Sequence, residues 1–128
     1  MTRDRPSLGD EAALEVTVTD AMLVEILGRR IHPVYATAWM VKHMEEAGRL
    51  LVEPHLGDGE DATGYAISVV HERPARAGDA LRVVARAVRV NDRECEADVE
   101  VLGPTGLVGR GTLVQRYIER GRLAEGSQ

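Results

Sequence analysis

The stretch that decides the fold is residues 36–52, ATAWMVKHMEEAGRLLV, the clearest helical pattern in a chain otherwise rich in strand patterns. Successive residues of a helix are 100° apart, and one arc of this one is apolar from Ala36 through Met44 to Leu51. The proline and glycines of residues 54–59 are expected to end the helix. The pattern predicts an amphipathic helix over residues 36–52.

Strand patterns lie on both sides of this helix. Each is a run of alternating or β-branched residues bounded by turn residues, which is typical of half-buried strands. Residues 20–32 give a weak signal that fits a short helix or an irregular connection. The expected strands are residues 14–19, 64–73, 80–90, 94–101 and 107–119.

The most regular alternation is residues 94–101, Glu-Cys-Glu-Ala-Asp-Val-Glu-Val, in which every second residue is acidic. Such a strand has one wet face and one buried face. Arg82 and Arg86 share parity on the preceding strand and are expected to face these acids across the hairpin. Each cross-strand pair would add a few tenths of a kcal/mol to about 1 kcal/mol.

The order of elements is a strand, the helix and then four strands in a meander. One helix covers only one face of a five-stranded antiparallel sheet, which predicts an α+β hotdog fold with the sheet wrapped around the helix. An open edge or face of this sheet would favour dimerisation. We expect a flexible N-terminal segment over residues 1–13, the domain over residues 14–123 and a flexible tail over residues 124–128.

Composition excludes several classes of function. The net charge is −5 and no basic stripe stands out, which argues against nucleic-acid binding. No apolar run is long enough for a membrane span or a signal peptide, so a cytoplasmic protein is expected. The four histidines have no zinc-ligand spacing with Cys95, which is expected to be a buried, unreactive thiol. Among them, His43 lies on the exposed flank of the helix and is expected at the surface. No phosphate-binding or nucleotide-binding glycine motif occurs, so we expect no metal and no cofactor.

The two adjacent glutamates of the helix have different expected environments. Glu46 lies with Lys42 on the polar side, whereas Glu45 falls in a stripe of small and apolar residues. A buried carboxylate is costly unless it is paired, so Glu45 is interpreted either as functional or as a structural carboxylate bonded to an arginine or to backbone.

Thr37 and His71 are the other candidates for chemistry. His71 ends a strand and is either a structural residue or a group that transfers protons near neutral pH. Thr37 either caps the helix or places a hydroxyl beside the N–H groups of the first turn. Thr37 and Glu45 would be about 12 Å apart along a helix. Either Thr37 lies in a bend before the helix or residues of two chains combine.

Several segments together resemble the fluoroacetyl-CoA thioesterase-like hotdog proteins. The similarity spans roughly residues 14–120. It is strongest in VYATAWMV (residues 34–41), Met44-Glu45, GYAISVVH (residues 64–71) and GTLVQR (residues 111–116).

The resemblance implies an acyl-CoA thioesterase that acts as a homodimer on an acyl-CoA substrate, with stacking into a tetramer left open. It implies that the catalytic set is Thr37, Glu45 and His71 and that Arg116 lies nearby. The family's named member has phenylalanines around its acyl pocket and this chain has none. Ile31 and Val34 are expected near those positions, so thioester hydrolysis is expected without fluoroacetyl selectivity.

In the implied mechanism the helix-start N–H groups polarise the thioester carbonyl. Glu45 either attacks it directly or activates water, and His71 assists proton transfer. Two alternatives stay open at this point. One is a hotdog hydratase or dehydratase acting on an enoyl thioester, and the other is a non-catalytic module that binds an acyl-CoA and leaves it intact.

Overall fold

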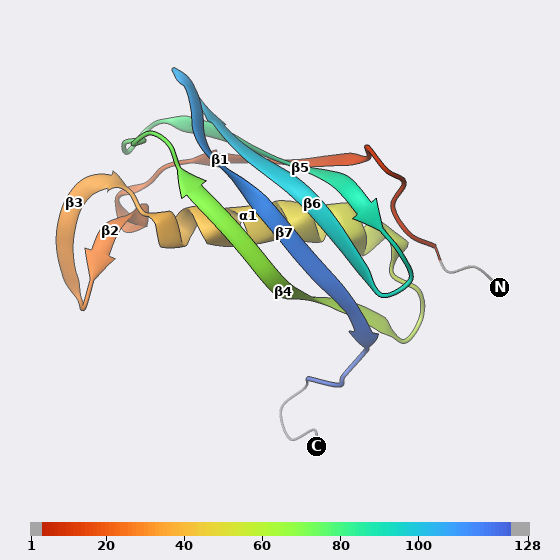
Figure 1. Ribbon diagram of the computed structural model, residues 1–128. Coiled ribbons are helices and arrows are strands. Elements are labelled where there is room, and N and C mark those ends of the chain that lie inside the picture. The colour runs from red at the N-terminus through yellow and green to blue at the C-terminus, as the bar shows by residue number, and fades with distance from the viewer. Residues whose placement is uncertain (1–3, 124–128) are drawn as a thin grey trace.

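A computed structural model describes residues 4–123, in which a single long helix lies along one face of a five-stranded antiparallel sheet (Figure 1). Helix α1 spans Thr37–Val52, close to the predicted range. Short 3₁₀ turns lie at Asp20–Met22 and Glu53–His55. The strands of the sheet are β1 (Glu11–Thr17), β4 (Glu60–His71), β5 (Ala80–Val90), β6 (Glu94–Gly103) and β7 (Gly106–Glu119).

The strand order is β1-β5-β6-β7-β4, so the predicted four-strand meander is wrong. Strand β4 pairs with β7 and not with β5: Glu60 lies opposite Glu119 and His71 lies opposite Gly109. The segment between β4 and β5 crosses from one side of the sheet to the other and is held by a hydrogen bond from the Tyr35 N–H to the Ala75 carbonyl. As a result β4 is an edge strand with one side unpaired in a single chain.

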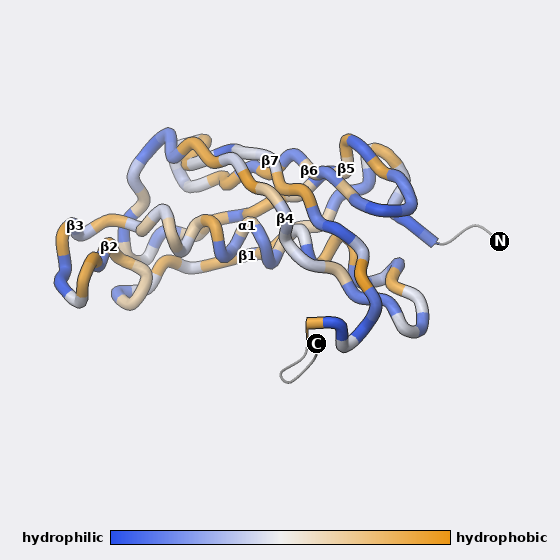
Figure 2. Tube along the Cα trace, turned by 60° about the horizontal axis from the view of Figure 1, so that its bottom comes forward, coloured by the Kyte–Doolittle hydropathy of each residue, from blue (hydrophilic) through white to orange (hydrophobic). Residues whose placement is uncertain are grey.

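The weak signal of residues 20–32 turns out to be a hairpin made of β2 (Leu23–Ile26) and β3 (Arg29–Tyr35). Its two turn residues, Leu27 and Gly28, have φ values of 54° and 77°. Positive φ at both turn residues matches the twist of a two-residue hairpin. The hairpin lies at the end of the molecule where α1 begins, in both views (Figures 1 and 2).

The core lies between α1 and the sheet. Met40, Met44 and Leu51 of the predicted apolar arc are buried against the inward residues of β5 and β6, several of which are alanines. These small residues let the helix approach the sheet closely. Gly48 adds to this effect, because a Cβ there would collide with the side chain of Leu113. Along the strands, apolar and polar residues alternate (Figure 2).

The alternation of β6 is confirmed, since Cys95, Ala97, Val99 and Val101 are buried. One of the two arginines expected to face its acids does so: Arg86 lies opposite Asp98.

The other arginine, Arg82, lies opposite Leu102 and instead forms an ion pair of 2.5 Å with Glu15 of β1. The reason is that the last residues of β6 are apolar, whereas β1 offers a carboxylate.

The boundary expected at residue 14 lies inside β1, which begins at Glu11. Before it, the Arg5 guanidinium makes two hydrogen bonds to the Glu60 carboxylate, at 3.0 and 2.9 Å, and lies 3.6 Å from the centre of the Tyr117 ring. The Arg5 side chain is only 7% exposed. Residues 5–10 are therefore attached to the sheet. The tail expected at residues 124–128 lies outside the described residues.

Within residues 4–123, α1 is too short and too polar to cross a membrane, and no other helix is a candidate for a membrane span.

Candidate active site

The start of α1 brings together two of the expected catalytic residues. Thr37 is the first residue of the helix, and its Oγ1 lies 2.8 Å from Nδ1 of His71 at the end of β4. The residue before it, Ala36, has no side chain that could cap the helix, so the N–H groups of the first turn have no side-chain acceptor from the cap. The Thr37 side chain is therefore engaged with His71 and does not act as the helix cap.

His71 lies half-buried beside the Tyr35 ring. Its ring meets the Tyr35 ring edge-on, with 6.2 Å between the centroids and 78° between the planes. Burial lowers the pKa of His71 below its ordinary value, and a backbone hydrogen bond at Arg73 opposes this shift in part. Its Nε2 is buried and has no hydrogen-bond partner among the described residues. The arrangement favours a neutral imidazole with one nitrogen held by Thr37 and the other available.

Val34, expected near the acyl pocket, lines a shallow hollow together with His71 and Tyr35. Ile31 lies on the same strand and is 42% exposed. The structure thus places both residues on β3, on the side of the molecule where α1 begins.

Glu45 is exposed in the single chain, so its predicted burial is wrong. Gly48 and Val52 of the same stripe are buried, but Glu45 itself lies toward the β4 edge of the sheet. The carboxylate lies over Gly64 of β4, where an added Cβ would be 3.0 Å from Oε2. Glu45 also lines a small hollow with Tyr65, Ile67 and Leu113. The neighbouring Glu46 pairs with Lys42 at 3.2 Å, as its polar position predicted.

Arg116 belongs to the same region as Glu45. It lies on β7 opposite Thr63, and its guanidinium is 3.4 Å from the centre of the Tyr65 ring. A hydrogen bond of 3.2 Å to Glu94 holds its Nε. Tyr65 lies at a bulge in β4 and is 59% exposed, so the stacked pair faces outward from the edge strand.

The expected catalytic residues therefore form two separate groups in one chain. Thr37 and His71 meet at the start of α1, whereas Glu45 lies eight residues farther along the same regular helix, about 12 Å away by helical rise. Because Thr37 is already helical, the alternative in which it lies in a bend before the helix is excluded. One chain does not bring the three side chains together.

Sequence reasoning missed three residues beside these groups. Gly64 and Tyr65 stand next to Glu45, and their place in the GYAISVVH motif was the available signal. His43 was expected at the surface but is 4% exposed, and its Nδ1 is 2.5 Å from the Tyr35 hydroxyl. The helical pattern could not show that Tyr35 covers this flank.

Cys95 is buried as predicted, and burial raises the pKa of its thiol to about 11, which suits an unreactive residue. Within residues 4–123 no three His, Cys, Asp or Glu side chains gather in a way that could hold a metal ion.

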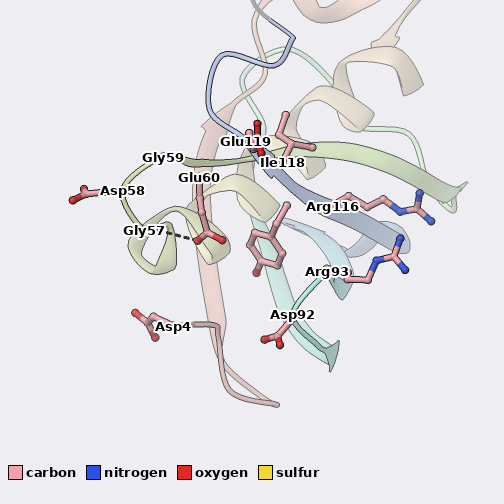
Figure 3. A pocket seen from close by; sticks show the side chains of 11 residues that line it. Asp4, Gly57, Asp58, Gly59, Glu60, Asp92, Arg93, Arg116, Ile118 and Glu119 are labelled. Atoms are coloured by element: carbon pink, nitrogen blue, oxygen red, sulfur yellow. Dashed lines mark hydrogen bonds between the residues drawn. The ribbon is translucent and has the colours of Figure 1, made fainter. Parts of the chain in front are cut away.

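A wider hollow lies beside Glu60, where β4 begins, and β4 ends at His71. Figure 3 shows the residues that line this hollow. It is lined by acidic residues, among them Asp4, Asp58 and Asp92, and Arg93 and Arg116 project toward one side of it. None of Thr37, Glu45 and His71 lines it. The many carboxylates disfavour an anionic ligand there.

Comparison with known proteins identifies the family and the fold. A family model described as fluoroacetyl-CoA-specific thioesterase matches residues 18–120. The chain belongs to this thioesterase family. The expected family is thereby confirmed. No curated protein matches the sequence.

Solved structures similar to this family member show the same architecture. A hypothetical protein of Thermus thermophilus, described as a thioesterase superfamily member, is 38% identical with a TM-score of 0.87, over 91% of this chain and 87% of that chain. The fluoroacetyl-CoA thioesterase itself is 27% identical with a TM-score of 0.82, over 88% of each chain. A hot-dog-like protein of Thermanaerovibrio acidaminovorans is 18% identical with a TM-score of 0.82, over 91% of this chain and 86% of that chain. The α+β hotdog fold is confirmed.

Proposed function

We propose that this thioesterase family member hydrolyses a small acyl-CoA thioester to the free acid and CoA, as a homodimer whose active sites each combine residues of two chains. The observation that carries the proposal is the separation of Thr37 and His71 from Glu45 along one regular helix. Solved structures of the related fluoroacetyl-CoA thioesterase include complexes with acetyl-CoA and with fluoroacetate and CoA, which supports the substrate class.

The free edge of β4 supplies the place where a second copy would pair. Tyr65, Ile67 and Val70 of this strand are 59%, 40% and 42% exposed, which is unusual for large apolar side chains in a sheet. In an antiparallel pairing of two β4 strands about a two-fold axis near Ser68, Gly64 and Tyr65 at the bulge of each chain lie opposite His71 of the other. This pairing would bring Glu45 of one chain, which lies over Gly64, toward Thr37 and His71 of the other.

The chemistry follows from these groups. The first-turn N–H groups of α1 donate hydrogen bonds to the thioester carbonyl oxygen and stabilise the negative charge that develops on it. Glu45 either attacks the carbonyl carbon, giving an anhydride that water then opens, or removes a proton from an attacking water. The C–S bond breaks, CoA leaves as a thiolate that takes up a proton, and the acyl group leaves as a carboxylate. Thr37 and His71 form the hydrogen bonds through which protons move at the carbonyl. No cofactor is needed beyond the CoA of the substrate.

Thiol release from a panel of acyl-CoAs, followed with a thiol-reactive dye, tests the proposal. Replacing Glu45 with Gln removes a base or nucleophile while keeping shape, and it should lower kcat by at least about a hundredfold. Glu46→Gln is the matched control, because Glu46 is an adjacent exposed carboxylate that forms an ion pair with Lys42. It should leave kcat unchanged, and a chelator should have no effect on either chain.

Other outcomes identify the alternatives. Full thiol release from the Glu45→Gln chain would refute the assignment of Glu45. Consumption of an enoyl-CoA without free thiol would indicate a hydratase. Calorimetric binding of acyl-CoAs with no turnover of any of them would indicate a non-catalytic binding module.

A further inference from the structure

A buried polar pair lies directly behind His71. Tyr35, at the end of β3, is fully buried, and His43 of α1 is 4% exposed. Their Oη and Nδ1 atoms are 2.5 Å apart, and their rings stack with 5.8 Å between centroids and 10° between planes. Apart from this pair, the polar residue among residues 4–123 that is buried as a whole is Gln115, which bonds to the Gly48 carbonyl. The Tyr35–His43 pair is therefore an exception in an apolar core.

The surroundings keep both members of the pair neutral. Burial lowers the pKa of His43, with Glu46 and Lys42 acting in opposite directions, and burial also raises the pKa of Tyr35 above its usual value. The other face of His43 meets Trp39, whose ring centroid is 5.7 Å away. A polar pair held like this costs desolvation that an apolar pair of the same shape avoids.

Tyr35 is the member of the pair whose ring contacts His71, the expected catalytic histidine. The Tyr35 ring meets His71 at 78°, while the His43 hydrogen bond and the stacking contact fix the plane of the Tyr35 ring. The opposite side of His71 is fixed by Thr37, through the 2.8 Å contact to Nδ1. The imidazole is thus held between a hydroxyl that orients one nitrogen and an aromatic edge that limits its rotation.

We propose that Tyr35 and His43 are positioning residues for His71: their hydrogen bond locks the Tyr35 ring, which holds the imidazole in the rotamer that faces the thioester. The pair touches no substrate atom in this scheme and acts only through His71. This inference rests on the proposed thioesterase function and assigns to that site two residues that lie in a layer behind it.

Three variants separate positioning from stability. Tyr35→Phe removes only the hydroxyl and leaves the ring against His71, and His43→Leu removes the other partner. Each single change leaves a buried polar atom without a partner and should lower stability. The double variant Tyr35→Phe/His43→Leu leaves neither atom unpaired, so its stability should return close to that of the native chain.

Activity should follow a different order from stability. All three variants should lower kcat about tenfold with KM changed less than about twofold, because an imidazole held loosely lowers the fraction of reactive geometry. Tyr117→Phe is the matched control, since Tyr117 is another tyrosine with a buried hydroxyl, and it lies beside Arg5 at the far end of β7. It should keep native kcat.

The decisive result is the double variant. Recovered stability with kcat still about tenfold low supports positioning, whereas recovered stability with native kcat refutes it and leaves the pair as a structural element. A second readout is independent of turnover: the ¹⁵N signals of the His71 ring should broaden or shift in Tyr35→Phe and stay unchanged in Tyr117→Phe. Absence of thiol release from the native chain would refute the proposed function. Unchanged His71 signals in Tyr35→Phe would separately refute the positioning role of Tyr35 and His43.

Discussion

Mixing two inactive chains tests the composite active site most directly. One chain carries Glu45→Gln and the other carries His71→Ala, so each lacks a member of the site that we place across the two-fold axis. In a homodimer of either variant, both sites are defective. In a mixed dimer, one site takes both altered residues, while the other takes native Glu45 from one chain and native His71 from the other.

The expected recovery follows from counting sites. Random exchange of equal amounts makes about half of the dimers mixed, and one site in each of these is native, so thiol release should return to about one quarter of the native rate per chain. The assay is thiol release after the variants are mixed, partly unfolded and refolded together. Each variant refolded alone is the control and should stay inactive.

A site made within one chain would give no recovery at any mixing ratio, because every chain would then lack one of its own residues. That result would refute the composite site. It would also require Glu45 to reach Thr37 over about 12 Å of helix, which the regular α1 does not allow. Sedimentation of the same mixture shows whether dimers formed, so the absence of recovery can be assigned to the site and not to failed association.

Three further changes have definite expected outcomes. Gly64→Ala places a Cβ 3.0 Å from the Glu45 carboxylate. Because this flexible side chain would be displaced, kcat should fall about tenfold, with less than about 1 kcal/mol lost in urea unfolding. Native kcat would show that the carboxylate adjusts freely. Burial lowers the pKa values of both His43 and His71 in the folded chain, so the unfolded chain binds more protons. The free energy of unfolding in urea should therefore be full above the ordinary pKa of 6.5 and fall as the pH drops below it. A His43→Leu chain should show a shallower fall, and an identical slope would contradict this account. Arg5→Ala breaks a largely buried ion pair and should cost about 3 kcal/mol in the same measurement, whereas a loss below about 0.5 kcal/mol would show that the N-terminal segment contributes nothing to stability.

Local patterns predicted the elements of the fold well. The helix expected at residues 36–52 begins one residue later, and the alternation at residues 94–101 gave both the strand and its buried face. The neighbours of β4 could not be read from local patterns, because they depend on how residues 72–79 cross the sheet. The β2–β3 hairpin was missed because its turn is Leu27-Gly28, in which a leucine adopts a positive φ that sequence rules assign to glycine or asparagine.

The candidate site shows the same division. The residue patterns alone left the roles of Thr37 and His71 open, and only the resemblance to the thioesterase family implied that they act together. The structure places their polar atoms 2.8 Å apart. The exposure of Glu45 and the burial of His43 were both predicted wrongly. A helical pattern shows which residues share a face, but it does not show whether a strand of the same chain, a strand of another chain or solvent covers that face.

The position of β4 also determines the order in which this protein can fold. Among residues 4–123, β4 pairs with β7, which is the last of these strands in chain order, and the pairing joins Glu60 to Glu119. During synthesis, β4 leaves the ribosome before β5, β6 and β7, so both of its edges stay unpaired until nearly the whole domain has emerged. Contacts this distant in sequence slow folding, since a large loop must close before they stabilise the chain. Unpaired strand edges favour incorrect association, so a nascent chain in which β4 awaits β7 is expected to be prone to it.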